Sequence, residues 1–273
     1  MVKLRTMPWI QNENGLTLIL ARDAVFAGPI QGLESLIKDN ELHVVTTTQK
    51  FPIGSMIWDP SIDAVYRYVE FGNTTAAGDM IQAEGPDGAH DDLNSNGTGS
   101  GASQAKGATL ISFSDTITLV KDEYAGGFMK IETGTGKGYR YPIKSHDAPA
   151  SNSLFTLWDP GLALAISGAT VALIKSRYKE VIQMPTTVTG VLVGAGLGVG
   201  ADGSFGWVQT RGPAAVLTDG TVVIGQHVRA SDGVAGAVEP LDRDGTAEDE
   251  AEVGYVMDVG PTTEFSLIFL TLE

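Results

Sequence analysis

The sequence predicts an all-β protein, built as two or three small β-barrel or β-sandwich modules with an extended N-terminal arm. Glycine is frequent, with 34 residues in a chain of 273, while charged residues make up only 19%, below the roughly 25% of soluble proteins. Short apolar runs rich in β-branched and aromatic residues alternate with Gly, Asp, Asn and Pro, which favour tight turns. Helical periodicity is confined to residues 30–39, enough for one short helix.

The predicted strands follow from these apolar runs and the turn residues beside them. In chain order they are residues 42–48, 64–71, 109–121, 128–132, 139–144, 154–159, 170–174, 179–184, 206–210, 214–217, 226–229 and 265–272.

Two shifts in composition suggest boundaries between domains. Residues 94–107 (NSNGTGSGASQAKG) are too polar and flexible to bury a core, and glycines interrupt a weakly apolar run at 186–204. We therefore expect four consecutive segments. They are an arm with one short helix (1–60), a small β segment with a flexible linker (61–105), a middle β-module (106–185) and a C-terminal β-barrel module (186–273).

Charge and cysteine content exclude several classes of function. The chain has 33 acidic and 18 basic residues and a net charge of −15, which repels nucleic acids and anionic lipid surfaces. The absence of cysteine removes disulfides, thiolate metal centres and cysteine nucleophiles. The N-terminus lacks the apolar core of a secretion signal, and the longest apolar run, 161–174, is too short to span a bilayer. We expect a soluble protein made in a cytoplasm, without a nucleic-acid or membrane partner.

Two glycine-rich segments imitate nucleotide-binding motifs. Residues 198–203 (GVGADG) fit G-x-G-x-x-G, but a strand-like segment follows where the motif requires a helix. Residues 134–138 (GTGKG) lack the spacing of a P-loop and lie between two predicted strands. Both segments are predicted to be turns, so no cofactor is expected.

Other candidate sites are equally well explained as surface loops. The acidic run 239–252 resembles part of a calcium loop, and residues 87–92 contain one histidine among carboxylates. We found no catalytic motif, so the sequence predicts a non-enzymatic protein without metal, with a hydrolase as a weaker alternative. The aromatic residues that could stack on a sugar are expected to fill the core instead; they are Tyr66, Tyr68, Phe71, Trp158, Tyr178, Trp207 and Tyr255.

Two groups of segments resemble a family of tailed-phage virion proteins. The first group is 124–128 (YAGGF), 134–143 (GTGKGYRYPI), 157–160 (LWDP) and 171–174 (VALI). The second is 206–217 (GWVQTRGPAAVL), 232–238 (DGVAGAV) and 253–258 (VGYVMD). The C-terminal arrangement is similar to the small β-barrels of capsid decoration, or cement, proteins. Residues 1–105 match less clearly.

The resemblance implies a structural role without catalytic residues. A decoration protein would bind the major capsid protein on the outside of the head, stabilise the shell, and self-associate as a homotrimer at three-fold positions. The apolar N-terminal segment needs a surface to cover it. Its expected capsid-contact residues are Trp9, Ile10, Leu16, Leu18 and Leu20. The alternative is a receptor- or glycan-binding component of a head fibre or tail.

Overall fold

The computed structural model describes residues 41–59, 61–91, 93–94, 103–113, 118–148, 153–241, 251–261 and 264–273, and the backbone of three short strands between residues 11 and 20. The prediction of an all-β protein is confirmed. In the described residues the regular structure consists of strands and two single-turn 3-10 helices, η1 (Glu41–His43) and η2 (Gly88–His90). The helix expected at residues 30–39 lies outside the described residues.

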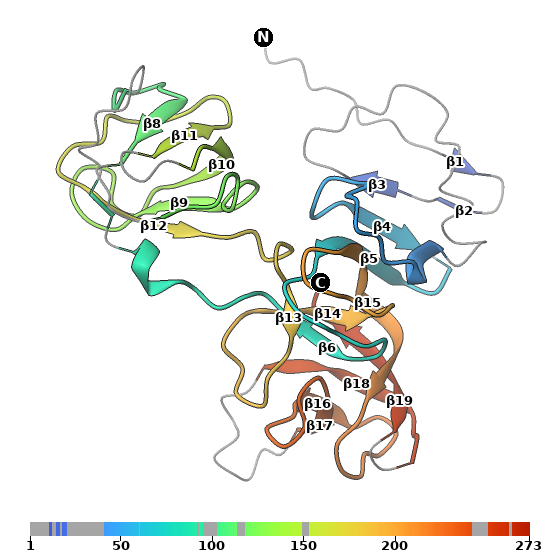
Figure 1. The fold of residues 1–273 in the computed structure, drawn as a ribbon. Coiled ribbons are helices and arrows are strands. Elements are labelled where there is room, and N and C mark those ends of the chain that lie inside the picture. Colours follow the sequence, from blue (N-terminus) through green and yellow to red (C-terminus); the bar gives the residue numbers. More distant parts are fainter. Residues whose placement is uncertain are drawn as a thin grey trace. The chain divides into compact units, whose positions relative to one another are not determined.

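The chain forms two compact units. Residues 1–84 and 178–273 form the first unit, and residues 85–177 form the second. The second unit is therefore inserted into the first, and the two units cut across the consecutive segments expected from composition. In Figure 1 the strands of the second unit are green to yellow, and those of the first unit are blue to teal and orange to red.

The first unit is built on one large antiparallel sheet. Its main path runs in the order β13–β6–β14–β15–β19–β18–β16–β17, while β5 pairs with β15, β4 with β5, and β3 with β4. A separate pair is formed by β1 (Gln11–Asn12) and β2 (Gly15–Leu16). The strands of the sheet are β3 (Leu18–Leu20), β4 (Met56–Asp59), β5 (Ala64–Glu70), β6 (Met80–Gln82), β13 (Ile182–Gln183), β14 (Leu192–Gly196), β15 (Phe205–Leu217), β16 (His227–Ala230), β17 (Val238–Pro240), β18 (Glu252–Asp258) and β19 (Phe265–Thr271).

Strand β15 is one continuous strand of 13 residues, so the prediction of two strands at 206–210 and 214–217 was wrong. Residues 211–213, which were expected to separate the two strands, belong to β15, and the register with β5 shifts at a bulge between Gln209 and Arg211. The Gln209 side-chain amide donates to the carbonyls of Arg211 and Pro213, each at 2.9 Å, which satisfies backbone groups at the bulge. Gly212 has φ +89°, and a Cβ there would lie 2.7 Å from the carbonyl oxygen of Asp63. A residue with a side chain would therefore clash at this point.

The core of the first unit follows from the two-residue period of its strands. In β19, Ser266, Ile268 and Leu270 are buried, whereas Phe265 and Leu267 are exposed. The buried side packs with residues of β15, β16 and β18 into one apolar cluster. The first half of β15 is buried more completely, and there Trp207 packs edge-on against Tyr68 with ring centroids 5.1 Å apart.

The second unit has its own sheet and its own core. Its strand order is β7–β12–β9–β10–β11–β8, and every pair is antiparallel. The apolar side chains of these strands form one cluster centred on Phe113, Met129, Ile143 and Phe155. The bounds are β7 (Leu93–Asn94), β8 (Leu110–Ser112), β9 (Phe128–Ile131), β10 (Arg140–His146), β11 (Leu154–Leu157) and β12 (Thr170–Ile174).

Two predicted strands and one predicted boundary segment need correction. Residues 42–48 form η1 and a single bridge from Thr46 to Phe205 instead of a strand. Of residues 109–121, only Leu110–Ser112 form a strand, although 114–117 lie outside the described residues. The glycine-rich segment 186–204 contains β14, all of which is buried. Glycine is needed in that strand, because a Cβ at Gly194 would lie 2.3 Å from the carbonyl oxygen of Gln209.

Candidate functional site

The residues expected to contact a capsid lie at the start of the chain. Leu16 is in β2, and Leu18 and Leu20 are in β3, which pairs with β4 through Leu18–Trp58 and Leu20–Met56. Trp9 and Ile10 lie outside the described residues, as do the side chains of the three leucines. The structure therefore joins the backbone of Leu18–Leu20 to the sheet of the first unit.

Both glycine-rich segments occupy the positions predicted from the sequence. Residues 134–138 connect β9 and β10, which pair as an antiparallel hairpin. Residues 198–203 connect β14 to β15, and Gly200 exchanges backbone hydrogen bonds with Thr75 at 3.1 and 3.2 Å. A strand follows this loop, so the helix N-terminus that would hold a pyrophosphate is replaced by a strand.

The acidic run 239–252 is described only at its two ends. Glu239 forms an ion pair with Arg229, and burial raises the pKa of the Glu239 carboxyl above its ordinary value although Arg229 lowers it. Glu252 accepts a hydrogen bond from His227 at 2.6 Å. Across the described parts of the chain, no group of three His, Asp or Glu side chains is placed to hold a metal ion.

Segment 87–92 was predicted to be a surface loop, and this was wrong for His90. The His90 side chain is buried and its Nδ1 contacts the hydroxyl of Tyr124 in the core of the second unit. His146 is also buried: its Nε2 accepts the Tyr124 backbone N–H at 2.9 Å, so its Nδ1 carries the proton donated to the carbonyl of Asp147 at 2.7 Å. Both histidines thus link neighbouring segments of the core.

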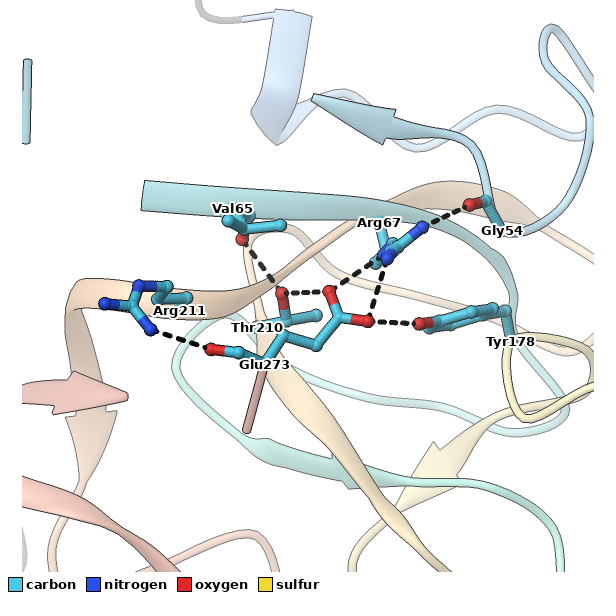
Figure 2. A network of polar contacts seen from close by, with 7 residues as sticks. All are labelled: Gly54, Val65, Arg67, Tyr178, Thr210, Arg211 and Glu273. Carbon is cyan, nitrogen blue, oxygen red and sulfur yellow. Dashed lines mark hydrogen bonds and ion pairs between the residues drawn. The ribbon is translucent and has the colours of Figure 1, made fainter. Parts of the chain in front are cut away.

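A polar network of the first unit surrounds Glu273 (Figure 2). Its carboxylate accepts two hydrogen bonds from Arg67 at 2.9 Å, one to each oxygen, and one from the Tyr178 hydroxyl at 2.7 Å. Thr210 Oγ1 lies 3.1 Å from Glu273 Oε2 and 3.2 Å from the carbonyl of Val65, and its single proton can serve only one of them. The carbonyl of Glu273 accepts from Arg211 at 3.0 Å.

This network connects segments that are distant in sequence. Arg67 also donates to the carbonyl of Gly54 at 3.0 Å and lies over the Tyr178 ring, 5.3 Å from its centroid. The side chains of Arg67 and Glu273 are only 20% and 17% exposed. A carboxylate whose oxygens already accept this many hydrogen bonds is a poor base or nucleophile. The arrangement therefore clamps β5, β15 and the segments at Gly54, Tyr178 and Glu273 together.

The seven aromatic residues expected in the core differ in burial. Tyr66, Tyr68, Phe71 and Trp207 are buried, as expected, whereas Trp158 and Tyr178 are only partly buried. Tyr255 is instead 36% exposed and belongs to an apolar surface on β15, β19 and β18, which we call the outer face. Met257, Phe265 and Leu267 on this surface are 40%, 51% and 37% exposed. The outer face consists of Pro213, Ala215, Leu217, Tyr255, Met257, Phe265, Leu267 and Phe269, together with the exposed Asp258, which lies opposite Leu267.

A row of stacked side chains crosses the outer face. The rings of Phe269 and Tyr255 are nearly parallel, with centroids 5.1 Å apart and an interplanar angle of 11°. Arg211 lies 5.9 Å from the Phe269 centroid, and the His227 ring lies 6.3 Å from that of Tyr255. Because β15, β19, β18 and β16 follow one another in the sheet, each of the two central rings has a neighbour on either side.

A hydrogen bond to a carboxylate closes each end of this row. Arg211 donates to Asp63 Oδ2 at 2.7 Å, and this hydrogen bond holds the pKa of the Asp63 carboxyl below its ordinary value. At the other end His227 pairs with Glu252. Sequence analysis did not identify the outer face, although the signal was present: residues 265–270 of β19 are apolar at alternate positions on both sides of the strand, Ser266 excepted.

No protein family matches the sequence, and no curated protein or solved structure proved similar to it. Within the described residues, no helix is both long and apolar enough to cross a membrane.

Proposed function

We propose that this chain is a non-enzymatic structural protein of a phage virion, a decoration protein that binds the major capsid protein on the outside of the head. One observation carries the proposal: the first unit uses the polar network around Glu273 internally and presents a largely apolar sheet face outward. Exposed apolar surface of this kind is typical of proteins that associate with other proteins. The resemblance of residues 124–258 to virion proteins supplies the capsid as the partner.

The alternative of glycan binding fits this face less well. A sugar stacks on the open face of an aromatic ring. Here Phe269 lies between Arg211 and Tyr255, and Tyr255 lies between Phe269 and His227. The row of stacked side chains therefore offers ring edges rather than open ring faces to a ligand, which favours a protein partner.

Binding of the purified chain to empty heads of the phage that encodes it tests the proposal. We expect saturable binding, a fixed number of copies per head and a higher melting temperature of the shell. Heads of an unrelated phage serve as the control. Absence of binding to the homologous heads, combined with binding to host cells or to a glycan array, would contradict a decoration role and support receptor recognition.

The contribution of the N-terminal arm needs two truncations. Removing residues 1–27 should abolish head binding, but it also removes β3, which pairs with β4. Removing residues 1–16 keeps β3 and still eliminates Trp9, Ile10 and Leu16. If this shorter truncation binds heads as the full chain does, those three residues are not capsid contacts, whether or not the longer truncation folds.

A further inference from the structure

Residues 119–127, which we call the Tyr124 segment, precede β9 in the second unit and are attached to β10 by hydrogen bonds. The Asp122 N–H donates to the carbonyl of His146 at 3.2 Å, and the His146 N–H donates to Asp122 Oδ1 at 2.9 Å. The Tyr124 N–H donates to Nε2 of the His146 ring at 2.9 Å. Three hydrogen bonds between the segment and β10 therefore involve His146, and one of them uses its ring.

The Tyr124 segment covers part of the core of the second unit. Leu119 and Tyr124 are only 3% and 1% exposed and belong to its apolar cluster. Asp122 has φ +59°, in a backbone region that residues other than glycine rarely adopt. The backbone N–H and the carboxylate of Asp122 both pair with His146. A change at His146 therefore acts directly on the part of the segment with the least favourable backbone.

The hydrogen bonds of the His146 ring require its neutral form. Nε2 accepts from the Tyr124 N–H, and Nδ1 donates to the carbonyl of Asp147 at 2.7 Å. A proton on Nε2 would point at a backbone N–H, which can only donate, so protonation of the ring breaks this hydrogen bond. His146 is 4% exposed and its ring stacks on Phe155. The Tyr124 N–H would thus lose its acceptor in a buried place, which is costly.

His90 also contacts Tyr124, but its contact tolerates a proton. Nδ1 of His90 contacts the Tyr124 hydroxyl, which can either donate or accept a hydrogen bond. Asp87 Oδ2 lies 3.6 Å from the same nitrogen. A protonated His90 can therefore donate to the hydroxyl beside a carboxylate. The two histidines that hold Tyr124 differ because one meets a hydroxyl and the other meets a backbone N–H.

The charged groups around His146 do not change this conclusion. On the segments that surround its ring they are Asp122, Glu123 with its ion-pair partner Lys175, and Asp147, with Asp87 beside His90; Phe155 on β11 is uncharged. Carboxylates favour a protonated histidine. Asp122 and Asp147 already accept backbone N–H groups through Oδ1. Their charge can attract a proton to the ring, but the Tyr124 N–H still loses its acceptor once that proton has bound.

We propose that His146 is an acid-sensitive latch, which holds the Tyr124 segment closed while its ring is neutral and releases the segment when the ring is protonated. The open form then binds one more proton than the closed form. The closed form has its full stability above the ordinary histidine pKa of about 6.5 and loses stability as the pH falls below it. The equilibrium constant for opening should rise by up to about tenfold for each pH unit. This inference is independent of the capsid proposal.

Hydrogen exchange of the full chain, followed by mass spectrometry at pH 7.5 and 5.5, tests the latch. Each rate is divided by the rate of an unstructured peptide of the same sequence at the same pH. We expect the protection of residues 119–127 to fall by about tenfold at the lower pH. Strands β15 and β19 of the first unit should keep their protection. Equal protection of residues 119–127 at the two pH values overturns the proposal.

Two substitutions separate the two histidines. In His146→Gln an amide oxygen takes the place of Nε2 as an acceptor but does not titrate, so the dependence on pH should disappear. His90→Gln removes the histidine whose contact tolerates a proton, and it should keep the tenfold change. The proposal is overturned if the tenfold change persists in His146→Gln or disappears in His90→Gln.

Ring ¹⁵N chemical shifts test the latch in the natural sequence, whether or not the variants fold. We expect His146 to keep the shifts of the neutral ring, with the proton on Nδ1, as long as residues 119–127 stay protected. The shifts of the protonated ring should appear only together with loss of that protection. A protonated His146 in a chain whose residues 119–127 remain protected would show that the closed segment accepts the charge, and the latch would be wrong.

Discussion

Ile182 on β13 is the antiparallel partner of Gln82 on β6, although the whole second unit lies between them in sequence. The chain leaves the first unit shortly after Gln82 and returns shortly before Ile182. Both ends of the inserted segment therefore emerge from neighbouring strands of one sheet, as the ends of a hairpin loop do. The second unit occupies the place of that loop.

Replacing residues 85–177 by a Gly/Ser linker of eight residues should leave the first unit folded. Such a linker spans about 16 Å, and the core of the first unit contains only residues of that unit. We expect a cooperative thermal transition, followed by the fluorescence of the remaining tryptophans, of which Trp207 is buried in the first unit. A shortened chain without a cooperative transition would show that the insertion is required for folding.

The pair formed by Arg67 and Glu273 should contribute strongly to the stability of the first unit. We expect Glu273→Ala or Arg67→Ala to lower the free energy of unfolding by about 2–3 kcal/mol, because each change leaves a mostly buried charged partner without the two hydrogen bonds of the pair. In a double-mutant cycle the two changes should not add, with a coupling energy of about 1 kcal/mol or more. Urea unfolding of the four proteins measures both quantities.

Asp63→Asn is the matched control for that cycle. Asp63 also pairs with an arginine, but both side chains of the Asp63–Arg211 pair are well exposed, and exposed ion pairs contribute little. Asn tolerates the positive φ of 52° at this position. We expect no change in unfolding free energy beyond experimental error. A loss as large as that of Glu273→Ala would mean that burial does not distinguish the two pairs.

His146→Ala should destabilise the second unit alone. The change leaves the buried Tyr124 N–H without its acceptor and opens space beside Phe155, whose ring lies 4.8 Å from that of His146. We expect a loss of about 2–4 kcal/mol. Hydrogen exchange followed by mass spectrometry should show faster exchange in 85–177 and unchanged exchange at β15 and β19. Equal acceleration in both units would contradict their separate folding.

Asp79 predicts how the stability of the first unit changes with pH. Its carboxylate accepts from the Ala76 N–H at 2.7 Å and from the Gln183 side chain at 2.9 Å, yet burial raises its pKa above the ordinary value. A carboxyl with a raised pKa in the folded state binds its proton more tightly there. Stability therefore falls as pH rises from the ordinary pKa of the carboxyl through its folded-state pKa.

Asp79→Asn should remove this loss, because the amide oxygen can still accept both hydrogen bonds. We expect the variant to be more stable than the natural sequence at pH 7, and the difference to shrink at pH 4. Urea unfolding at both values measures it. A difference that does not vary with pH would mean that the charge of Asp79 has no influence on stability.

Strand positions could be predicted wherever a two-residue period was flanked by turn residues. The bounds of β12 were predicted without error, and those of β5, β9 and β19 were within one residue. The prediction failed where contacts distant in sequence decide the structure. Glycine is required at position 194, in a buried strand, because the backbone of Gln209 approaches it closely. Strand β15 continues past Gly212 because the Gln209 side chain donates to the carbonyls of Arg211 and Pro213.

The candidate site was harder to foresee, for a physical reason. The partners of Glu273 come from positions 67, 178, 210 and 211, and such pairings depend on the strand order rather than on any local motif. The outer face depends on the register of β15, β19 and β18. Periodicity shows that both sides of β19 are apolar, but only the sheet shows which side packs in the core.

Strand β15 joins the two parts of the first unit's interior. Its early residues Trp207 and Val208 belong to the clusters beside β5, while Ala214 and Val216 belong to the cluster beside β19. A strand that runs through both clusters cannot be released from one without pulling on the other. The first unit should therefore resist mechanical load as a single element and rupture in one step, instead of yielding in two.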